Sequence, residues 1–438
     1  AALSPGFWLS FGAVAALLWA ARLHGRGTPP PVWRVWALAQ WAVTLGLLPL
    51  LLALFHEVSL VSPLANAVAI PAISLLAVPL ALLASAFPWE ALVWAAHAVV
   101  QAVMWGLQAL LLLPHPLFHA AAPGALAIFL GLIGAALLLL PPGVPARWLG
   151  AVLCLPLLLP RVPAPASGVA WLDVVDVGQG SAALVRTAHH ALLVDAGPRY
   201  VSGEDAGARI VAPFLWSQGV THLDGLVLTH DDLDHSGGVP TLLASHRPDW
   251  VLTPLAGLPP ENLSETGRAI LAAAPRPLSC HAGQQWTWEG VRFSVLHPPA
   301  HHYAMPGYRD NERGCVVRIE AGSRAVLLAA DIERLSEMNL LERRVLQPAD
   351  VLVVPHHGSA TSSTPAFLDA VRPRLAIIPV GHRNRYGHPH PEVLARYRQR
   401  EVEVLRTDRG GAVRVALGER GVEVATARAA ERRYWHAR

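Results

Sequence analysis

Imidazole and carboxylate side chains are concentrated in one short segment, HDDLDH at residues 230–235, directly after an apolar run. Four potential ligands stand at relative positions 0, 2, 4 and 5 of this segment, namely His230, Asp232, Asp234 and His235. Such side chains can point in two directions from one tight turn, which suits a pair of metal ions. Nitrogen and oxygen ligands favour Zn²⁺ or Mn²⁺, and the absence of thiolates argues against a closed structural zinc site. The alternative interpretation is an acidic turn that caps the helix after it.

Further potential ligands follow other apolar runs of the same half. Asp331 ends one run, and the adjacent His356 and His357 end another. A carboxylate between two clusters can bridge both ions, and ions roughly 3.5 to 4 Å apart can together polarise a phosphoryl oxygen and activate water. His297 is a candidate to complete the first site, although a histidine before a Pro-Pro turn is also an ordinary structural feature. The pattern predicts a dinuclear hydrolytic centre.

The elements that must position these ligands are short strands. From Val169 onward the sequence consists of β-branched runs, each of which ends in a turn or polar cluster. Helical patterns lie between the runs, at residues 206–218, 264–274, 333–345 and 365–371. Many strands with interspersed helices predict an α/β domain of two sheets over residues 169–438. Because the candidate ligands follow strands, we expect the functional residues to lie together at the ends of the strands.

The first 160 residues have a different composition. They contain four of the 34 basic residues and two of the 31 acidic residues. Six apolar segments, most of them near the roughly 20 residues that a spanning helix needs, run at residues 6–22, 33–55, 64–87, 90–113, 124–141 and 146–160. We therefore predict a polytopic membrane domain of about six helices over residues 1–160, followed by a linker at residues 161–168.

The orientation of these helices can be predicted from arginines in short loops, which favour the cytoplasmic side. Arg22, Arg26 and Arg34 flank the first loop, whereas the loops near residues 56–63 and 114–123 contain no arginine. The first loop is therefore expected in the cytoplasm. Six alternating spans then leave residues from 161 onward on the outer side.

Two local features allow alternatives. Pro63, Pro71 and Pro79 at the third apolar segment predict either a broken helix that lines a cavity or a kinked structural helix. Cys280 and Cys315 in the soluble half are interpreted as a pair of buried thiols, with a disulfide as the alternative.

The segment HDDLDH resembles the HxHxDH motif of the metallo-β-lactamase superfamily, with Asp232 in place of the second histidine. Within this superfamily, the chain resembles the ComEC/Rec2 DNA-uptake proteins along nearly its whole length. The matching segments are DVGQGSAALV, LLVDAG, DNERGCVVRIE, LLAADIE, HHGSATSS and NRYGHPHPEVL in the soluble half, and SLVSPLANAVAIP and LSFGAVAALL in the membrane half. The family commonly has Ser where this chain has Gly314. It usually also has an N-terminal OB-type domain and further spans, so we expect this sequence to be part of a longer protein.

The resemblance implies a fold and a set of ligands. The fold is a C-terminal α/β metallo-β-lactamase domain, an αββα sandwich, behind a polytopic α-helical membrane domain. The implied ligands are His230, Asp232 and His297 for one divalent ion, Asp234, His235 and His357 for the other, and Asp331 for both. Consecutive residues that leave a strand diverge, so the sequence does not decide between His356 and His357 as the ligand.

Catalytic and supporting residues are implied in the same way. Asp234, His356 and His388 are the expected catalytic residues, with His356 facing the substrate phosphate. Asp195 would brace ligands rather than bind metal. Four further residues are expected near the site, namely Asn311, Ser359, Asn384 and Tyr386. Of these, Asn384 is expected to contact substrate together with His388, although each of the polar residues is also an ordinary turn former.

For function, the resemblance implies DNA uptake in natural transformation. The membrane domain would pass a single strand, and the soluble domain would be a metal-dependent nuclease that degrades or processes incoming DNA. The expected surroundings are the bacterial inner membrane, with the hydrolase domain on its periplasmic or extracellular side, other competence proteins such as a DNA receptor and a helicase, and a homo-oligomer. Two alternatives remain: a surface or periplasmic phosphodiesterase acting on a non-nucleic-acid phosphoester, and a non-catalytic DNA-guiding module.

The C-terminal region is basic. After residue 369 there are 15 arginines and seven carboxylates. Five of these arginines lie between residues 383 and 400, namely Arg383, Arg385, Arg396, Arg398 and Arg400. Such a bias can follow a phosphate backbone, and the alternative is a solvated helix face.

Overall fold

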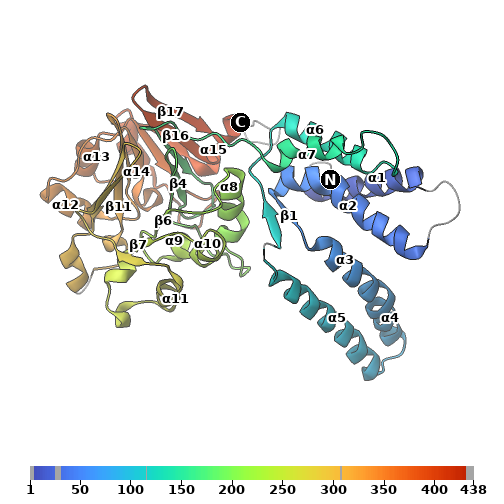
Figure 1. Cartoon of the computed structure of the whole chain (residues 1–438). Helices are drawn as coiled ribbons and strands as arrows, with labels where there is room; N and C mark the ends of the chain where they lie inside the picture. Colours follow the sequence, from blue (N-terminus) through green and yellow to red (C-terminus); the bar gives the residue numbers. More distant parts are fainter. Residues whose placement is uncertain (1–3, 25–30, 115, 306–307, 431–438) are drawn as a thin grey trace. The chain divides into compact units, whose positions relative to one another are not determined.

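The computed structural model describes residues 4–24, 31–114, 116–305 and 308–430. The chain divides near residue 162 into two compact units, a helical unit and an α/β unit (Figure 1). Each unit has its own core, because apolar residues of the helical unit pack on one another and those of the α/β unit pack between sheets and helices.

The helical unit is built from apolar segments with few charges. Its elements are α1 (Pro5–His24), α2 (Val32–Phe55), β1 (Glu57–Ser59), α3 (Ser62–Pro71), η1 (Ala72–Ala77), α4 (Val78–Ala86), α5 (Glu90–Leu111), β2 (Leu117–His119), α6 (Ala125–Leu138) and α7 (Leu149–Leu158). Within the described residues, four helical segments are long and apolar enough to cross a membrane, if α3, η1 and α4 are taken as one helix. The last two of the six expected spans, α6 and α7, have 14 and 10 residues, which is shorter than a membrane crossing needs.

The third span is continuous rather than broken. Its middle, η1, is a π-helical turn that lies directly after Pro71 and before Pro79. Proline has no backbone N–H, and a π turn shifts the hydrogen bonds to the i→i+5 pattern, so that Val78 donates to the carbonyl of Ile73. The prolines therefore widen the helix locally without ending it.

A short antiparallel ladder joins two loops of the helical unit. Strand β1 pairs with β2, with Glu57 opposite His119 and Ser59 opposite Leu117. These strands belong to the two loops that contain no arginine. Of the arginines used to predict orientation, Arg26 lies outside the described residues.

The α/β unit contains two sheets. The first has the order β17-β16-β3-β4-β5-β6-β7-β8 and the second the order β15-β14-β13-β12-β11-β10-β9. The strands of the first sheet are β3 (Ala170–Val174), β4 (Ala183–Arg186), β5 (Ala191–Val194), β6 (Gly225–Val227), β7 (Val251–Thr253), β8 (Pro277–Ser279), β16 (Val413–Gly418) and β17 (Gly421–Thr426). Those of the second are β9 (Gln285–Trp288), β10 (Val291–His297), β11 (Val316–Ala321), β12 (Arg324–Leu328), β13 (Val351–Val353), β14 (Leu375–Ile378) and β15 (Glu403–Arg406).

Helices complete the layers, as Figure 1 shows. The α-helices of this unit are α8 (Ala212–Ser217), α9 (Leu233–Ser236), α10 (Val239–Ser245), α11 (Glu265–Ala273), α12 (Arg334–Glu342), α13 (Pro365–Val371), α14 (Pro391–Arg398), α15 (Thr407–Gly410) and α16 (Ala427–Ala430). The shorter turns are η2 (Gly207–Val211), η3 (Pro254–Gly257), η4 (Pro260–Asn262), η5 (Ala300–Ala304), η6 (Asn311–Arg313) and η7 (Pro355–Gly358). This arrangement of two sheets and covering helices agrees with the expected αββα sandwich, and helices lie within all four predicted helical patterns.

The main core lies between the sheets. Leu172 and Val185 of the first sheet and Phe293 and Ile319 of the second belong to one buried cluster, and each of them is almost fully inaccessible to solvent. A second cluster, which includes Phe367, fills the space between the second sheet and helices such as α13. Burial of side chains of this size contributes about 1.5–3 kcal/mol each, so the sheets form a rigid support for the residues at their ends.

Cys280 and Cys315 form a disulfide. The interpretation as a pair of free thiols was therefore wrong. Cys280 follows the edge strand β8 of the first sheet and Cys315 precedes β11 of the second, so the bond links the two sheets. The remaining cysteine, Cys154, is a buried thiol in the helical unit.

Candidate metal centre

The ligand-rich turn follows strand β6, as the sequence predicts. Strands β5, β6 and β7 run parallel, and so do β12, β13 and β14, so residues after their carboxyl ends meet at one edge of the sandwich. His230 comes directly after this part of the sheet, and the one-turn helix α9 then carries Asp234 and His235. Asp232 lies at the N-cap of this helix in an extended conformation, and its side chain is half-exposed while its Oδ2 lies 3.5 Å from Nε2 of the buried His230.

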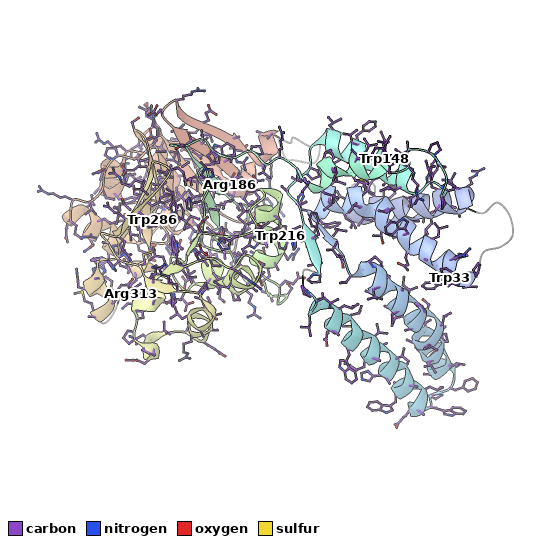
Figure 2. All side chains as sticks on the ribbon, viewed as in Figure 1. Trp33, Trp148, Arg186, Trp216, Trp286 and Arg313 are labelled. Carbon is purple, nitrogen blue, oxygen red and sulfur yellow. A yellow bond between two sulfur atoms is a disulfide. The ribbon has the colours of Figure 1, made fainter. Side chains whose placement is uncertain are left out.

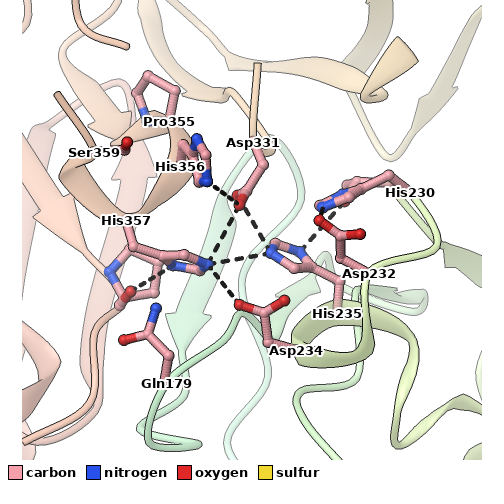
Figure 3. A network of polar contacts seen from close by, with 12 residues as sticks. Gln179, His230, Asp232, Asp234, His235, Asp331, Pro355, His356, His357 and Ser359 are labelled. Carbon is pink, nitrogen blue, oxygen red and sulfur yellow. Dashed lines mark hydrogen bonds and ion pairs between the residues drawn. The ribbon is translucent and has the colours of Figure 1, made fainter. Parts of the chain in front are cut away.

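Two groups of potential ligands converge at this edge, and they share one histidine (Figure 3). The first group is His230, His235 and Asp331, and the second is Asp234, His235 and His357. Asp331 stands between them: its Oδ1 lies 3.2 Å from Nε2 of His235, and its Oδ2 lies 3.4 Å from Nε2 of His357. On the other side of His357, Oδ2 of Asp234 lies 3.3 Å from the same nitrogen.

The donor set fits a metal ion. The Nε2 atom of His230 is buried and has no hydrogen-bond partner among the described residues, and Oδ2 of Asp232 lies 3.5 Å from it. A buried polar atom without a partner costs about 1–3 kcal/mol, and a cation between nitrogen and carboxylate would remove that cost. The Nε2 atoms of His235 and His357 approach to 3.2 Å, and each of them also lies within 3.4 Å of an oxygen of Asp331. Imidazole and carboxylate ligands of this kind suit Zn²⁺ or Mn²⁺.

Asp195 holds the ligands from behind. Its Oδ2 lies 2.7 Å from Nδ1 of His235 and accepts a hydrogen bond from the hydroxyl of Thr229, while its Oδ1 accepts from the backbone N–H of Thr229. The same hydroxyl lies 3.0 Å from Nδ1 of His230. His357 is held in the same manner, because its Nδ1 donates to the carbonyl of Pro379 at 2.7 Å. Such contacts fix which ring nitrogen faces the metal site.

The structure separates the two adjacent histidines. His357 is buried and belongs to the second ligand group, whereas the side chain of His356 remains partly exposed. Both have left-handed backbone conformations, with φ of 51° for His356 and 53° for His357. Nδ1 of His356 lies 3.3 Å from a carboxylate oxygen of Glu333, and its Nε2 lies 3.8 Å from Asp331. His356 therefore borders the ligand groups without entering them.

The buried charges stabilise one another. Burial alone would raise the pKa of Asp331, but His357 and His235 outweigh it and hold that pKa well below its usual range. The pKa of Asp234 is also lowered, by the hydrogen bond from His357 and the charge on His235, against the effect of burial. Conversely, burial would lower the pKa of His235 and His357, but Asp331 raises both. The carboxylates thus keep their negative charge beside the imidazoles.

A loop at residues 381–390 lies beside the site. His388 and His356 have ring centroids 5.9 Å apart, and Tyr386 stacks on His388 at 5.8 Å. Burial, with the nearby His356 and His357, lowers the pKa of His388 to about 4. The exposed Arg385 donates to the Tyr386 hydroxyl and is close enough to Asp234 to interact with its charge.

Asn384 has a role in the loop itself. Its amide nitrogen donates to the carbonyls of Gly381 and His388, and its amide oxygen accepts from the backbone N–H of His388. These bonds occupy both ends of the amide, which favours the turn-forming alternative over the expected substrate contact.

Three other expected residues lie apart from the two ligand groups. The Nε2 of His297 is occupied by the carbonyl of Glu312 at 2.9 Å, and burial lowers the pKa of this histidine to about 3. Asn311 begins η6, and its backbone carbonyl accepts from Gly314. Ser359 is buried after η7, where its hydroxyl lies 3.0 Å from that of Thr361, which in turn lies 3.3 Å from Nδ1 of His356.

Sequence reasoning missed several residues that shape the site. Gly180 has φ of 132°, and a Cβ atom there would lie 2.2 Å from the backbone oxygen of Asp234. Its neighbour Gln179 accepts a hydrogen bond from Gly381 and so ties the loop to the site. Glu333 supports His356. Gln179 and Gly180 belong to the DVGQG segment. This segment supported the family resemblance, but no structural role was predicted for it.

Some arginines of the basic C-terminal region form contacts within the fold. Arg400 pairs with Asp369, and Arg396 donates to the carbonyls of Ser362 and Ser363. These two arginines are therefore not free to form part of a continuous basic surface along a phosphate backbone. Arg385 remains exposed on the loop beside the metal centre.

Comparisons with known proteins agree with both units. Residues 1–145 match the family model for competence proteins, and residues 175–382 match that of the metallo-beta-lactamase superfamily. Competence protein ComA of Neisseria gonorrhoeae is 37% identical over 97% of this chain and 57% of its own length. Recombination protein 2 of Haemophilus influenzae is 31% identical over the same shares of the two chains. The metallo-beta-lactamase fold protein YhfI of Bacillus subtilis is a solved structure with 15% identity and a TM-score of 0.36, over 56% of this chain and 98% of its own. The chain spans a little over half the length of the two competence relatives.

Proposed function

Because the chain belongs to the ComEC/Rec2 family of competence proteins, in which a membrane segment precedes a metallo-β-lactamase domain, we propose that it hydrolyses DNA phosphodiesters with two divalent ions. The ions would be Zn²⁺ or Mn²⁺. The reaction would degrade or process DNA that enters the cell during transformation.

One observation carries this proposal: two ligand groups share His235 and have the Asp331 carboxylate between them. A shared carboxylate permits two ions at the short separation used by two-metal hydrolases. A single structural ion would need neither the shared carboxylate nor the partly exposed Asp232. His230 and Asp232 would hold one ion, Asp234, His235 and His357 the other, and Asp331 both.

The chain's own residues have separate tasks in such a reaction. When bound, the ions would polarise a phosphoryl oxygen and lower the pKa of water. Asp195 and the carbonyl of Pro379 orient the ligand imidazoles. His356, held by Glu333 at the border of the site, would meet the substrate phosphate and protonate the departing oxygen. His388 beside it is the second catalytic residue. Because its pKa is lowered to about 4, it would be neutral near pH 7 and would accept a proton or a hydrogen bond rather than act as the acid. Arg385 would attract the phosphate backbone.

We place the hydrolase domain outside the cytoplasm. The disulfide between Cys280 and Cys315 supports this side, because disulfides persist in oxidising compartments. The loops that contain β1 and β2 lack arginine, which supports a position outside the cytoplasm for these loops as well. If α6 and α7 do not cross the membrane, four spans replace six. Both numbers are even, so the predicted side of residue 161 is unchanged.

The membrane helices would pass a single strand as part of a longer protein. A DNA receptor and a helicase are the expected partners on the two sides of the membrane, and more than one copy would assemble around the path. These roles rest on the family membership and not on a pore within the described residues.

A nuclease assay tests the proposal directly. The full chain in detergent micelles would be incubated with Mn²⁺ and a labelled single-stranded oligonucleotide, with bis-p-nitrophenyl phosphate as a small diester. Cleavage of both is expected, with loss of both on chelation and recovery on addition of metal. Turnover of the small diester alone would replace the nuclease by a phosphodiesterase of another phosphoester. If neither is cleaved and an Asp234→Ala cell transforms normally, the domain is a non-catalytic guide.

A further inference from the structure

A tryptophan-lined cavity lies where both sheets of the α/β unit end. Its volume is about 370 Å³, and its walls include Trp250, Trp286 and Trp288 together with Arg276 and Gln285. Arg276 precedes β8, the edge strand of the first sheet, while Trp286 and Trp288 belong to β9, the edge strand of the second. Figure 2 marks the position of Trp286. The cavity contains none of the residues of the metal centre.

The three indoles do not fill the cavity by stacking on one another. Trp250 meets Trp286 edge to face at 5.5 Å and 79°, and Trp286 meets Trp288 at 6.1 Å and 65°. One face of Trp286 stacks on Phe293 and one face of Trp288 stacks on His190, each nearly parallel. Ring surface of all three tryptophans that these contacts do not cover lines the cavity.

The fold makes room for these rings. A Cβ atom at Gly225 would lie 2.3 Å from the ring of Trp250, so only glycine allows the indole to lie against strand β6. The indole nitrogen of Trp286 is buried and has no hydrogen-bond partner among the described residues. An unpaired buried donor is costly in a cavity that no ligand enters. The exposed Arg276 places a positive charge at the same cavity.

We propose that this cavity binds a nucleobase of single-stranded DNA, with Trp286 and Trp288 as the stacking surfaces and Arg276 against the adjoining phosphate. Flat aromatic faces accept any base, and the volume lies within the roughly 300–1,000 Å³ of small-molecule sites. A membrane-anchoring surface is less well matched, because interfacial tryptophans project into lipid whereas these three line a hollow. The choice of DNA as ligand rests on the proposed function, whereas the cavity itself does not.

Binding to the full chain in detergent micelles tests the inference. Fluorescence anisotropy of oligothymidylate would be measured in EDTA, which prevents cleavage. Trp288→Ala and Arg276→Glu are expected to weaken binding about five- to a hundredfold. Arg268→Glu, a charge reversal of an exposed arginine on α11, is the matched control and should leave binding unchanged. An abasic oligonucleotide of equal length should bind the wild type weakly and show no loss in Trp288→Ala.

Several outcomes would overturn the inference. Equal binding of the abasic strand, or wild-type affinity in both cavity variants, would show that no base enters the cavity. Binding to phosphatidylglycerol vesicles that is lost in Trp288→Ala, without binding of oligothymidylate, would identify a membrane surface instead. Hydrolysis of bis-p-nitrophenyl phosphate with Mn²⁺ should survive in the cavity variants, which controls for their folding. If that hydrolysis is absent in the wild type while base-dependent binding persists, only the proposed hydrolase activity fails.

Discussion

The inner and outer parts of the metal centre are built differently. In the inner part, His235 and His357 are almost fully buried, and each has its second ring nitrogen tied to a carboxylate or a carbonyl. In the outer part, Asp232 and His356 are partly exposed, and Tyr386 lies on an exposed loop. The inner part has the properties of a preformed ligand set, whereas under the proposed function the outer part would contact the DNA substrate. Substitutions should therefore separate metal binding from substrate binding.

The largest effect is expected for Asp331→Asn. The amide removes the charge between the two ligand groups, so we expect loss of metal and a fall in phosphodiester hydrolysis of about a thousandfold or more. Asp369→Asn is the matched control, because this exposed carboxylate pairs with Arg400 on the surface. Hydrolysis rate and metal content per chain would be measured together. Full metal content with a normal rate in Asp331→Asn would contradict the shared-carboxylate arrangement.

The second-largest effect is expected at Asp195, which orients the ligand His235. Asp195→Asn weakens the contact to Nδ1 of His235, and loss of such a contact typically costs about 10- to 100-fold in metal affinity. Activity should therefore return as metal is added in excess. A metal titration of the hydrolysis rate measures this shift. If excess metal restores nothing, Asp195 acts in the reaction rather than as a brace.

A smaller effect on folding stability is expected at the glycine that packs against Asp234. Gly180→Ala places Cβ against the Asp234 backbone, which should lower the free energy of unfolding by about 1–3 kcal/mol and disturb metal retention. Gly178→Ala is a closely matched control, because Gly178 also has positive φ but a Cβ there meets nothing within 4 Å. Thermal unfolding of both variants separates the effect of the contact with Asp234 from the strain that a positive φ causes for alanine. Equal losses would mean that backbone conformation alone matters.

The smallest effect belongs to the outer loop. Tyr386→Ala should raise KM for an oligonucleotide about tenfold through lost stacking, with little change in kcat. Hydrolysis of a small diester should be unchanged, because that substrate does not reach an exposed ring. A fall in kcat on both substrates would instead assign Tyr386 to the inner part.

The sequence predicted the inner part better than the outer. The local spacing of HDDLDH and the position of Asp331 after a strand predicted that these side chains lie close together. The structure brings them together because parallel strands end at one edge of the sandwich. The choice between His356 and His357 was beyond the sequence, since both backbones are left-handed and the alternation of a strand no longer applies. Asn384 was expected to contact substrate because it matches a family position near the site, yet only the folded loop reveals that both ends of its amide form hydrogen bonds.

Tertiary proximity explains the other differences. Cys280 and Cys315 are 35 residues apart, and nothing local to either cysteine indicates that β8 and β11 bring them together. Composition predicted six apolar segments, but it does not fix where a helix begins and ends, and α6 and α7 are shorter than their apolar segments. In the third span, the prolines are accommodated by a π turn that depends on the hydrogen bonds of the whole helix.

The ladder between β1 and β2 has a consequence for how the chain threads the bilayer. Two strands that share backbone hydrogen bonds must be in the same aqueous compartment, so the chain between Ser59 and Leu117 crosses an even number of times. The α3 to α4 helix and α5 are each long and apolar enough to cross once, and two crossings satisfy this parity without reference to charge. A label attached at either strand would therefore report the compartment of the other.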